Sequence, residues 1–522
     1  MRRLVTLLGT PALIAVSLTL VSASNFIAGP LGPVSDPISP FATCTADHVG
    51  QQLGVNFPNS TVEPWVDVNP TNTLNIVASW QQDRWSNGGS RGLVAGVSAD
   101  GGATWTSVVI PKITACSGNP DFLRASDPWL SFAPNGDLYH VSLSITVGPD
   151  GLTAPSALLV SKSTDGGLTW GAPITVKRDD RATVLNDKES ITADPDDASL
   201  VYLVWDRLES PQAQASDVAF EHALGFRGPT WFSRTTNGGT SWEPARLIFD
   251  PGEVNQTIGN QIVVLPNGDL IDVFNLIFNH KNAHKVRGFN VALLRSTDKG
   301  ATWSGPIIVD KLLTRALFDP QQIGVRDPDT GDPVRTGDII PEVAVDRSPS
   351  SPGHGNLYIV WQDSRFSNFA HDSIAFSKST DGGLTWSQPI QINRTPTLNI
   401  SSGNQQAFTP AIRVAAEGTI AVTYYDFRNN TSDPTTLPTD AFIVHCHASA
   451  KADSCTHPSD WASETRLTPT SFDMRNAPVA RGFFLGDYEA LTVVGSDFFR
   501  PVFVGAGSLK GTSEVVTTTV GP

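Results

Sequence analysis

The stretch Ser379-Thr380-Asp381-Gly382-Gly383-Leu384-Thr385-Trp386 decides the fold, because it occurs in closely similar form four more times. The other copies share a Ser or Thr, an Asp or Asn two residues later, a Gly and a closing Trp, and are Ser98–Trp105, Ser163–Trp170, Thr235–Trp242 and Ser296–Trp303. Successive copies start 65, 72, 61 and 83 residues apart. This spacing indicates that each copy marks one supersecondary unit in an array.

The residue types of the repeat predict the tip of a β-hairpin. The Asp or Asn side chain can accept hydrogen bonds from nearby backbone N–H groups, and Gly supplies a positive φ. The closing Trp then starts the return strand and covers the turn with a large apolar ring. We therefore interpret the five copies as structural elements.

The segments between the repeats are also similar to one another. Seven copies are visible: 64–70, 128–134, 189–195, 260–266, 341–347, 410–416 and 489–495. Each leads through a turn into a second apolar segment, such as Leu357–Trp361. The hairpin-tip repeat follows on a third strand and a fourth comes after its Trp, so the chain predicts four strands in each unit. An all-β propeller of four-stranded blades has this organisation.

The five hairpin-tip segments resemble the Asp boxes (BNR repeats) of the sialidase superfamily, Ser-x-Asp-x-Gly-x-Thr-Trp. The resemblance implies a β-propeller in which each box joins the third and fourth strands of a blade, on the side away from the active site. It also implies a glycoside hydrolase of the exo-α-sialidase type that acts on terminal sialic acids or related anionic sugars. Asp boxes also occur in propellers that bind without cutting, so a non-catalytic glycan- or protein-binding module is an alternative.

Seven inner-strand copies favour seven blades, whereas sialidases have six, which stays the alternative. The last unit, Leu485 to Pro522, is short of one strand. Because a propeller must cover its open edges, we expect a segment near His48 to Phe57 to complete it. The predicted domains are a signal peptide at 1–23, a closing N-terminal segment at 24–60 and the Asp-box propeller at 61–522.

The N-terminus has the pattern of a secretory signal, with Arg2 and Arg3 before an apolar run from Leu4 to Val21 and a small residue at Ala23. The apolar run is long enough for an uncleaved membrane anchor as an alternative. Removing residues 1–23 leaves 34 basic and 51 acidic side chains, a formal charge of −17. Nucleic acid and anionic membrane surfaces are then poor partners. We expect a secreted, monomeric protein that binds a glycan and needs no cofactor.

Four cysteines in an exported chain predict two disulfides, which we assign as Cys44–Cys116 and Cys446–Cys455. The second closes a short loop where a sixth box would stand, with Trp461 at the position of the box Trp. His445 and His447 could suggest a metal site, but in a strand they share one face while Cys446 points away. The loop Asp327–Asp332 could suggest calcium, yet it lacks the distal Glu of an EF-hand, and a solvated acidic turn is favoured.

Propeller geometry predicts that the loops entering the inner strands and those leaving the second strands meet on one face. The entering loops carry Glu63, Asp127, Glu189, Glu342, Asp487, Tyr488 and Glu489. The exits contain an aromatic residue, an Asp and an Arg, and their arginines are Arg84, Arg207, Arg365 and Arg428.

The resemblance to sialidases, which grip the sialic acid carboxylate with three arginines, makes these four arginines candidate substrate-binding residues, together with Glu189. An Asp one or two residues before each Arg fits a structural ion pair between blades equally well. Sialidases also use a tyrosine nucleophile, so Tyr488 is the candidate here, with Glu342 or Glu189 taking its proton and Asp127 as acid/base. The alternative for Tyr488 is a ring that lines the propeller channel.

The chain departs from the family at one motif. The Arg-Ile-Pro segment that supplies the first arginine of sialidases has no counterpart, since Asp338 and Ile339 precede Ile340-Pro341. A hydrolase or lyase for another polysaccharide, which would use paired carboxylates from Asp127, Glu189 and Glu342, is therefore a further alternative.

Overall fold

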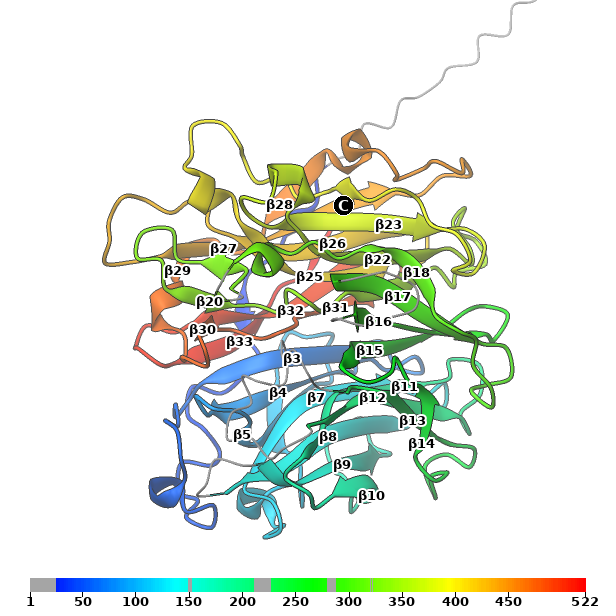
Figure 1. Cartoon of the computed structure of the whole chain (residues 1–522), viewed down its shortest axis with the longest axis vertical. Coiled ribbons are helices and arrows are strands. Elements are labelled where there is room, and N and C mark those ends of the chain that lie inside the picture. The colour runs from blue at the N-terminus through cyan, green and yellow to red at the C-terminus, as the bar shows by residue number, and fades with distance from the viewer. Residues whose placement is uncertain (1–24, 149–152, 211–226, 279–287, 320, 322) are drawn as a thin grey trace, which may run out of the picture.

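The computed structural model describes residues 25–522 except 149–152, 211–226, 279–287, 320 and 322 (Figure 1). In this part of the chain the regular structure is β-strand, with short 3₁₀ turns as its only helical segments. None of the described residues forms a helix able to span a membrane. The predicted signal peptide lies outside the described residues.

Most strands form antiparallel groups of four, each ordered in space as in the chain. The first two groups are β3–β6 (Thr61–Val68, Ile76–Arg84, Ser90–Ser98, Thr106–Val109) and β7–β10 (Arg124–Phe132, Leu138–Val147, Thr153–Ser163, Ile174–Asp179). The next two are β11–β14 (Val184–Ala193, Val201–Glu209, Thr230–Thr235, Arg246–Phe249) and β15–β18 (Asn255–Val264, Leu270–Phe278, Gly288–Ser296, Ile307–Lys311). Then come β21–β24 (Glu342–Val345, Leu357–Asp363, Ser373–Ser379, Ile390–Gln391) and β25–β28 (Ala407–Val414, Thr419–Asp426, Pro438–His447, Ser463–Arg466). The predicted all-β architecture is confirmed and is consistent with a β-propeller.

The first strands of these groups surround a common axis. β3 contacts β7, and the contacts continue through β11, β15, β21 and β25 to β31 (Ala490–Val494), which contacts β3 again. In Figure 1, β3, β15 and β31 accordingly cross the middle of the molecule, while outer strands such as β10 and β23 lie toward its lower and upper parts. Apolar side chains pack between neighbouring groups and form the core.

The hairpin-tip repeats fold as predicted. In the copy that joins β9 to β10, the Asp165 carboxylate accepts hydrogen bonds from the Thr169 backbone N at 2.9 Å and its hydroxyl at 2.6 Å. The hydroxyl of Ser163 accepts a bond from the Gly167 backbone N at 2.9 Å. Gly166 and Gly167 have φ of +73° and +97°, a conformation that only glycine adopts without strain.

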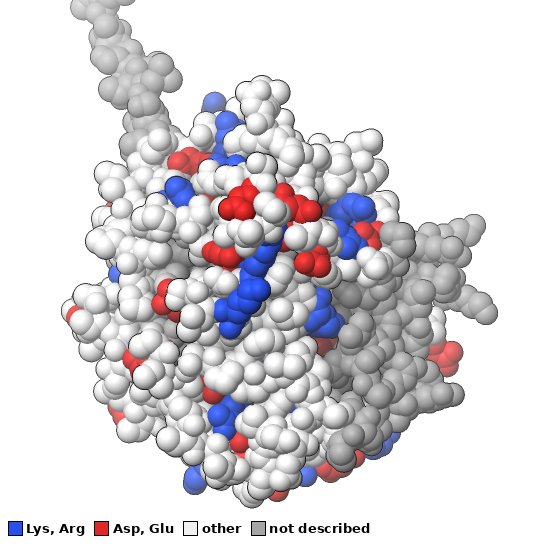
Figure 2. Space-filling model, turned by 90° about the vertical axis from the view of Figure 1, so that its left-hand side faces the viewer, with Lys and Arg blue, Asp and Glu red and all other residues white. Residues whose placement is uncertain are grey.

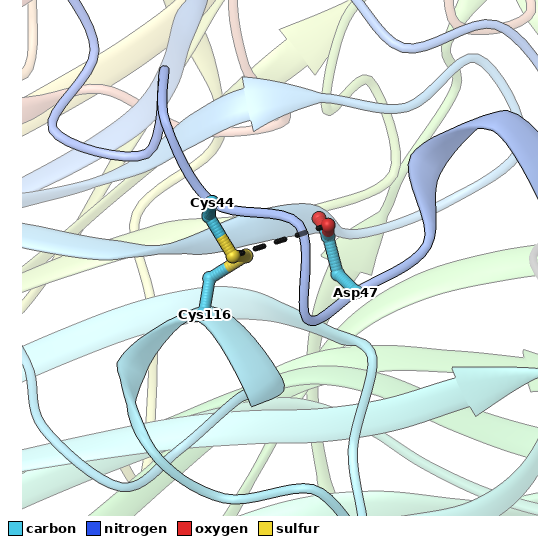
Figure 3. Close-up of side chains that lie close together, drawn as sticks. All are labelled: Cys44, Asp47 and Cys116. Carbon is cyan, nitrogen blue, oxygen red and sulfur yellow. Dashed lines mark hydrogen bonds between the residues drawn. A yellow bond between two sulfur atoms is a disulfide. The ribbon is translucent and has the colours of Figure 1, made fainter.

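Both predicted disulfides are present. Cys446–Cys455 closes the turn after β27, and the buried Trp461 donates its indole N–H to the Cys455 carbonyl at 3.0 Å. Cys44–Cys116 ties the N-terminal segment to the first group of strands (Figure 3). Asp47, the carboxylate beside this disulfide, pairs with Arg91 at 2.6 Å.

The last group contains strands from both ends of the described chain. β31, β32 (Phe498–Ala506) and β33 (Ser513–Thr517) are completed by β2 (Gly32–Pro33), while β1 (Ile27–Ala28) pairs with β34 (Val520–Gly521). The prediction that residues near 48–57 complete this group is wrong. Asn56 instead bridges to Trp85, because the disulfide at Cys44 holds this segment against the first group.

An insertion between β18 and β21 covers one end of the axis. It contains β19 (Val325–Arg326) and β20 (Pro333–Arg335), and β20 pairs in parallel with β30 (Phe483–Phe484). A further short strand, β29 (Phe472–Asp473), pairs with β27. Figure 2 shows the side of the molecule on which β20, β29 and β30 lie, where basic and acidic side chains adjoin near the middle. The insertion brings chain segments remote in sequence to the entrance of the inner strands.

Candidate functional site

Five of the innermost strands have a register shift at the same place, where each enters the ring. The residue in each shift has a left-handed backbone: Glu63 (φ +53°), Asp127 (+50°), Lys188 (+48°), Gly259 (+72°) and Thr409 (+49°). Four of these are not glycine, and such a conformation costs free energy that the surroundings must offset. Bulges of this kind re-aim a side chain, and here they bring charged groups from neighbouring strands together.

Lys188 is the centre of this arrangement. Its ammonium lies 2.8 Å from a carboxylate oxygen of Asp487, 3.6 Å from Asp127 and 3.8 Å from Glu63. On the other side, the Arg335 guanidinium Nε donates to Asp487 at 2.9 Å. All of these side chains are buried except that of Arg335, which is nearly buried. Glu63, Asp127, Lys188, Arg335 and Asp487 are called the central cluster below.

A cavity of about 200 Å³ opens beside the central cluster. Its charged lining residues are Lys188, Arg335, Arg481, Asp338 and Asp487. Apolar side chains of Ile258, Ile339 and Ile340 and the loop around Gly324 complete the wall. Gly337 allows the insertion to approach closely, because a Cβ there would lie 1.6 Å from the Asp487 carbonyl oxygen. The cavity therefore brings Lys188, Arg335 and Asp487 within reach of a small ligand, whereas Glu63 and Asp127 are buried and do not line it.

The carboxyl groups of this site have opposite electrostatic environments. Burial raises the pKa of Glu63 to about 8, although the Lys188 ammonium opposes the shift. Burial also acts to raise the pKa of Asp487, but Arg335 and Lys188 outweigh it and hold that pKa well below its usual range. At neutral pH Glu63 is consequently protonated and Asp487 is ionised.

Glu189 follows the Lys188 bulge and is buried. Neither of its carboxyl oxygens has a hydrogen-bond partner among the described residues. Burial and the charge of Asp127 raise the pKa of Glu189 well above the usual value and so favour its neutral form.

Tyr488, the predicted nucleophile, is buried against the stacked pair Trp65 and Trp129, with ring centroids 6.2 and 5.5 Å away. Its hydroxyl donates to the Pro128 carbonyl at 3.3 Å. Burial, and then the charges of Glu63 and other carboxylates, raise the Tyr488 pKa well above the usual value, which opposes formation of the phenolate. Its environment resembles the channel-lining alternative more than that of an activated phenol.

The two predicted carboxylates occupy different networks. Asp127 belongs to the central cluster and accepts a hydrogen bond from the Ser126 hydroxyl at 2.9 Å. Glu342 instead accepts from the Gln261 amide at 3.2 Å and lies 3.9 Å from the Arg413 guanidinium. Burial raises the pKa of Glu342 to about 7.

Three of the four predicted substrate-binding arginines lie in ion pairs: Arg207 with Asp179 at 2.7 Å, Arg365 with Asp363 at 2.8 Å and Arg428 with Asp426 at 2.6 Å. Asp179 is on the outermost strand β10, and Arg365 and Arg428 also reach carboxylates on outermost strands, Asp310 on β18 and Glu464 on β28. These contacts match the structural ion-pair alternative.

Arg84 differs from the other three. It is buried, donates to the Gln81 side chain at 2.7 Å and lies over the Phe484 ring at 5.1 Å. Gln81 in turn donates to Glu63, so Arg84 adjoins the central cluster.

Two members of the central cluster were missed in the sequence. Lys188 stands one residue before an inner-strand copy, in the same column as Glu63, Asp127 and Tyr488, and that alignment could have identified it. Arg335 lies in an insertion outside the repeats, where no sequence pattern marks it. The sequence places Glu63 and Asp487 in the loops that enter the inner strands, but assigns neither a catalytic nor a binding role to them.

The suggested metal sites have other partners. Asp327 accepts from the Arg475 guanidinium at 2.6 Å, and Cys446 is in its disulfide. His447 bonds to the Thr419 hydroxyl at 2.8 Å, and His445 stacks on Phe26 at 3.7 Å. Asp327, Cys446 and His447 thus have protein partners, while the two ring nitrogens of His445 are buried without a hydrogen-bond partner among the described residues.

A comparison with protein-family models and one with curated proteins each find no match to this sequence. Among solved structures, the chain is similar to an α-L-arabinofuranosidase from Fusarium graminearum, with 13% identity over 95% of this chain and 98% of the other and a TM-score of 0.44. It is also similar to a Hadza microbial sialidase, with 14% identity over 86% and 74% of the two chains and a TM-score of 0.44. A Streptococcus pneumoniae sialidase shows 13% identity, coverage of 94% and 71% and a TM-score of 0.38. These three neighbours are thus an α-L-arabinofuranosidase and two sialidases.

Proposed function

We propose that the protein is a secreted glycoside hydrolase whose reacting groups belong to the central cluster. The observation that supports it most is the placement of Glu63, Asp127 and Lys188 on strained bulges of adjacent innermost strands, beside a cavity. Strained backbone that gathers buried charges at one cavity is typical of an active site. The cavity has the size for one sugar ring.

The roles follow from the opposite environments of two carboxyl groups. Glycoside hydrolysis needs an acid that protonates the leaving oxygen and a carboxylate that attacks the anomeric carbon or activates water. Glu63, protonated up to a pH of about 8, is the proposed acid. Asp487, ionised and lining the cavity, is the proposed carboxylate, and Lys188 lies between the two.

A sialidase reaction is the second candidate, and the position of Tyr488 favours it. The phenol lies near Glu63, Asp127 and Glu189, and Glu63 or Glu189 in its ionised form, which a rising pH populates, would accept its proton. In this reaction Tyr488 attacks the anomeric carbon and Asp127 protonates the leaving group. Arg335, which lines the cavity although it also pairs with Asp487, would then bind the sugar carboxylate together with Arg84. The ion-pair partners of Arg207, Arg365 and Arg428 on the outermost strands do not line this cavity. Glu342 would support the site through Arg413.

Kinetics on a panel of umbelliferyl glycosides, including α-L-arabinofuranoside and sialoside, would test both candidates. For the carboxylate mechanism, Glu63→Gln and Asp487→Asn should lower kcat/KM by about 10²-fold or more, and Tyr488→Phe should change it little. Loss confined to the sialoside and caused by Tyr488→Phe would instead establish the sialidase reaction. Glycan binding by a wild type that hydrolyses none of the substrates would mean that the protein is a non-catalytic binding module.

We further infer the finer architecture. The closed series of contacts among β3, β7, β11, β15, β21, β25 and β31 supports seven blades, completed by the segment 24–60. We infer cleavage after Ala23, export and a monomeric mature protein whose partner is a glycan. Two measurements test this: N-terminal sequencing of the exported protein and light scattering of the purified chain.

A further inference from the structure

Two phenylalanine rings are exposed and in contact on the loops next to the cavity. The ring centroids of Phe318 and Phe369 lie 4.4 Å apart at an interplanar angle of 36°. Phe318 is 46% exposed and Phe369 is 38% exposed. Exposed aromatic rings that pack mainly on each other gain little from the core, so the pair suggests contact with a ligand.

Phe318 is held at a short distance from the cavity. It ends the 3₁₀ turn η3 (Arg315–Phe318), and Gln321, three residues later, lines the cavity. Three residues span at most about 11 Å. Arg326 donates to Asp319 at 3.1 Å and to the Gln321 side chain at 2.8 Å, which holds these two residues close together.

Phe369 is held in a strained conformation. Its backbone is left-handed, with φ +66°, and Asn368 before it also has a positive φ of +53°. A bulky residue seldom adopts this conformation, and its cost persists only where the surrounding structure imposes it. The strain presents the ring to solvent against Phe318.

One hydroxyl joins both loops to the cavity wall. Thr314 Oγ1, at the start of η3, lies 3.0 Å from Asp372 and 2.8 Å from the cavity-lining Asp338. Asp372, three residues after Phe369, also accepts from the Arg315 backbone N at 2.7 Å. The two rings are therefore fixed relative to each other and to the cavity.

Arg315 adds a polar group beside the rings. Residues three apart in a 3₁₀ turn lie on the same face, so Arg315 and Phe318 share one. The Arg315 side chain is partly exposed and its Nη2 lies 3.8 Å from Asp319, while its Nη1 is buried without a hydrogen-bond partner within the described part of the chain. A flat apolar surface with a nearby donor suits a sugar ring, which has an apolar C–H face and hydroxyls at its edge.

We propose that Phe318 and Phe369 form a platform for the sugar unit linked to the one in the cavity. This inference rests on the proposed glycan substrate and adds that the substrate has at least two units. The rings contact substrate away from the bond that breaks, so they strengthen binding of longer substrates and leave the chemistry on a single sugar unchanged.

The test compares Phe318→Ala and Phe369→Asn with the wild type on an umbelliferyl monosaccharide and on trisaccharides, with arabinotriose, xylotriose and sialyllactose as probes. Asn tolerates the left-handed backbone at 369, so the ring is removed without added strain. We expect KM for the cleaved trisaccharide to rise at least tenfold, while kcat/KM for the monosaccharide stays within twofold. Equal effects on both substrates, or no effect on the trisaccharide, would overturn the proposal.

Phe498→Ala is the matched control, because Phe498 is 45% exposed but lies at the opposite end of the inner strands, where β31 turns into β32. It should leave both substrates unaffected. If nothing is cleaved, trisaccharide binding followed by saturation-transfer NMR decides separately. If the trisaccharide binds and its binding weakens tenfold in Phe318→Ala, the platform proposal is supported although the hydrolase proposal fails. If the trisaccharide does not bind, or binds equally well without either ring, the platform proposal is overturned.

Discussion

At the scale of single residues, the hairpin-tip repeat is a compact hydrogen-bonded turn whose acceptors come from side chains. The same bonds recur in the four copies that contain Asp: Asp100, Asp298 and Asp381 accept from the backbone N and hydroxyl of the Thr four residues later, as Asp165 does. In the third copy Asn237 accepts from the Ser241 backbone N at 3.0 Å. The chain itself therefore shows that an amide can replace the carboxylate.

This recurrence predicts the effect of substitutions at Asp165. Asp165→Ala should lower the free energy of unfolding by about 1 kcal/mol, because backbone and hydroxyl donors lose their acceptor at an exposed turn. Asp165→Asn should cost less, since Asn retains the acceptor oxygen that Asn237 uses. Urea denaturation measures both, and an equal loss for the two variants would contradict the hydrogen-bond account.

At the scale of strands and turns, the bulges connect backbone strain with the site. Gly259 occupies the bulge of β15, with a φ of +72°, and a Cβ added there would lie 3.0 Å from the Ile340 side chain. Gly259→Ala should therefore lower the free energy of unfolding by about 1–3 kcal/mol through backbone strain and crowding.

Gly305→Ala is the matched control for this substitution, because an added Cβ at 305 meets nothing within 4 Å and the backbone there is not left-handed. It should leave the thermal midpoint unchanged or slightly raised. A midpoint for Gly259→Ala equal to that of Gly305→Ala would show that the bulge tolerates any residue.

The disulfides give a second prediction at this scale. Cys44–Cys116 spans 72 residues and Cys446–Cys455 spans 9. By loop-closure entropy, replacing the first pair with serines should cost about 4 kcal/mol and the second about 3 kcal/mol. Denaturant unfolding of the two double variants tests this order, and thiol titration of the unreduced wild type should detect no free thiol.

The strands were predictable because their signals are local: apolar segments, turn residues and the repeated hairpin tip. The closing strand at Gly32–Pro33 was not, since two residues carry no strand pattern and their pairing with β33 is set by the whole ring. In the site, Asp127 and Tyr488 were placed correctly at the entrance. The sequence did not identify Lys188, because the bulge turns its side chain to the face opposite the one that strand alternation predicts. It did not identify Arg335, because this residue lies in the insertion.

At the scale of the whole molecule, several buried carboxyl groups have raised pKa values. Besides Glu63 at about 8 and Glu342 at about 7, burial raises the pKa of Asp372 to about 7 and of Asp67 to about 6. In the unfolded chain such groups ionise near pH 4. Their contribution to stability is therefore fully present below pH 4 and is lost as pH rises through 6 to 8.

We expect the thermal midpoint to fall by several degrees between pH 5 and pH 8.5. Asp487, whose pKa is lowered, acts in the opposite sense but only below about pH 4. Glu342→Gln should flatten the decline, because an amide does not titrate. Calorimetry across this range measures the slope, and a slope identical in wild type and variant would exclude Glu342 as a contributor.

The last group of strands joins residues near both ends of the described chain: Gly32 and Pro33 pair with Thr517 and Val516, and Ile27 and Ala28 pair with Gly521 and Val520. Ribosomes release the N-terminal partners first, and they find their places only when the C-terminal partners have been synthesised. During synthesis the first segment therefore stays with unpaired edge strands, exposed to proteases and to other nascent chains. Ring closure thus makes completion of the fold a late event, and truncated chains that lack the C-terminal partners should be removed by proteolysis before they accumulate.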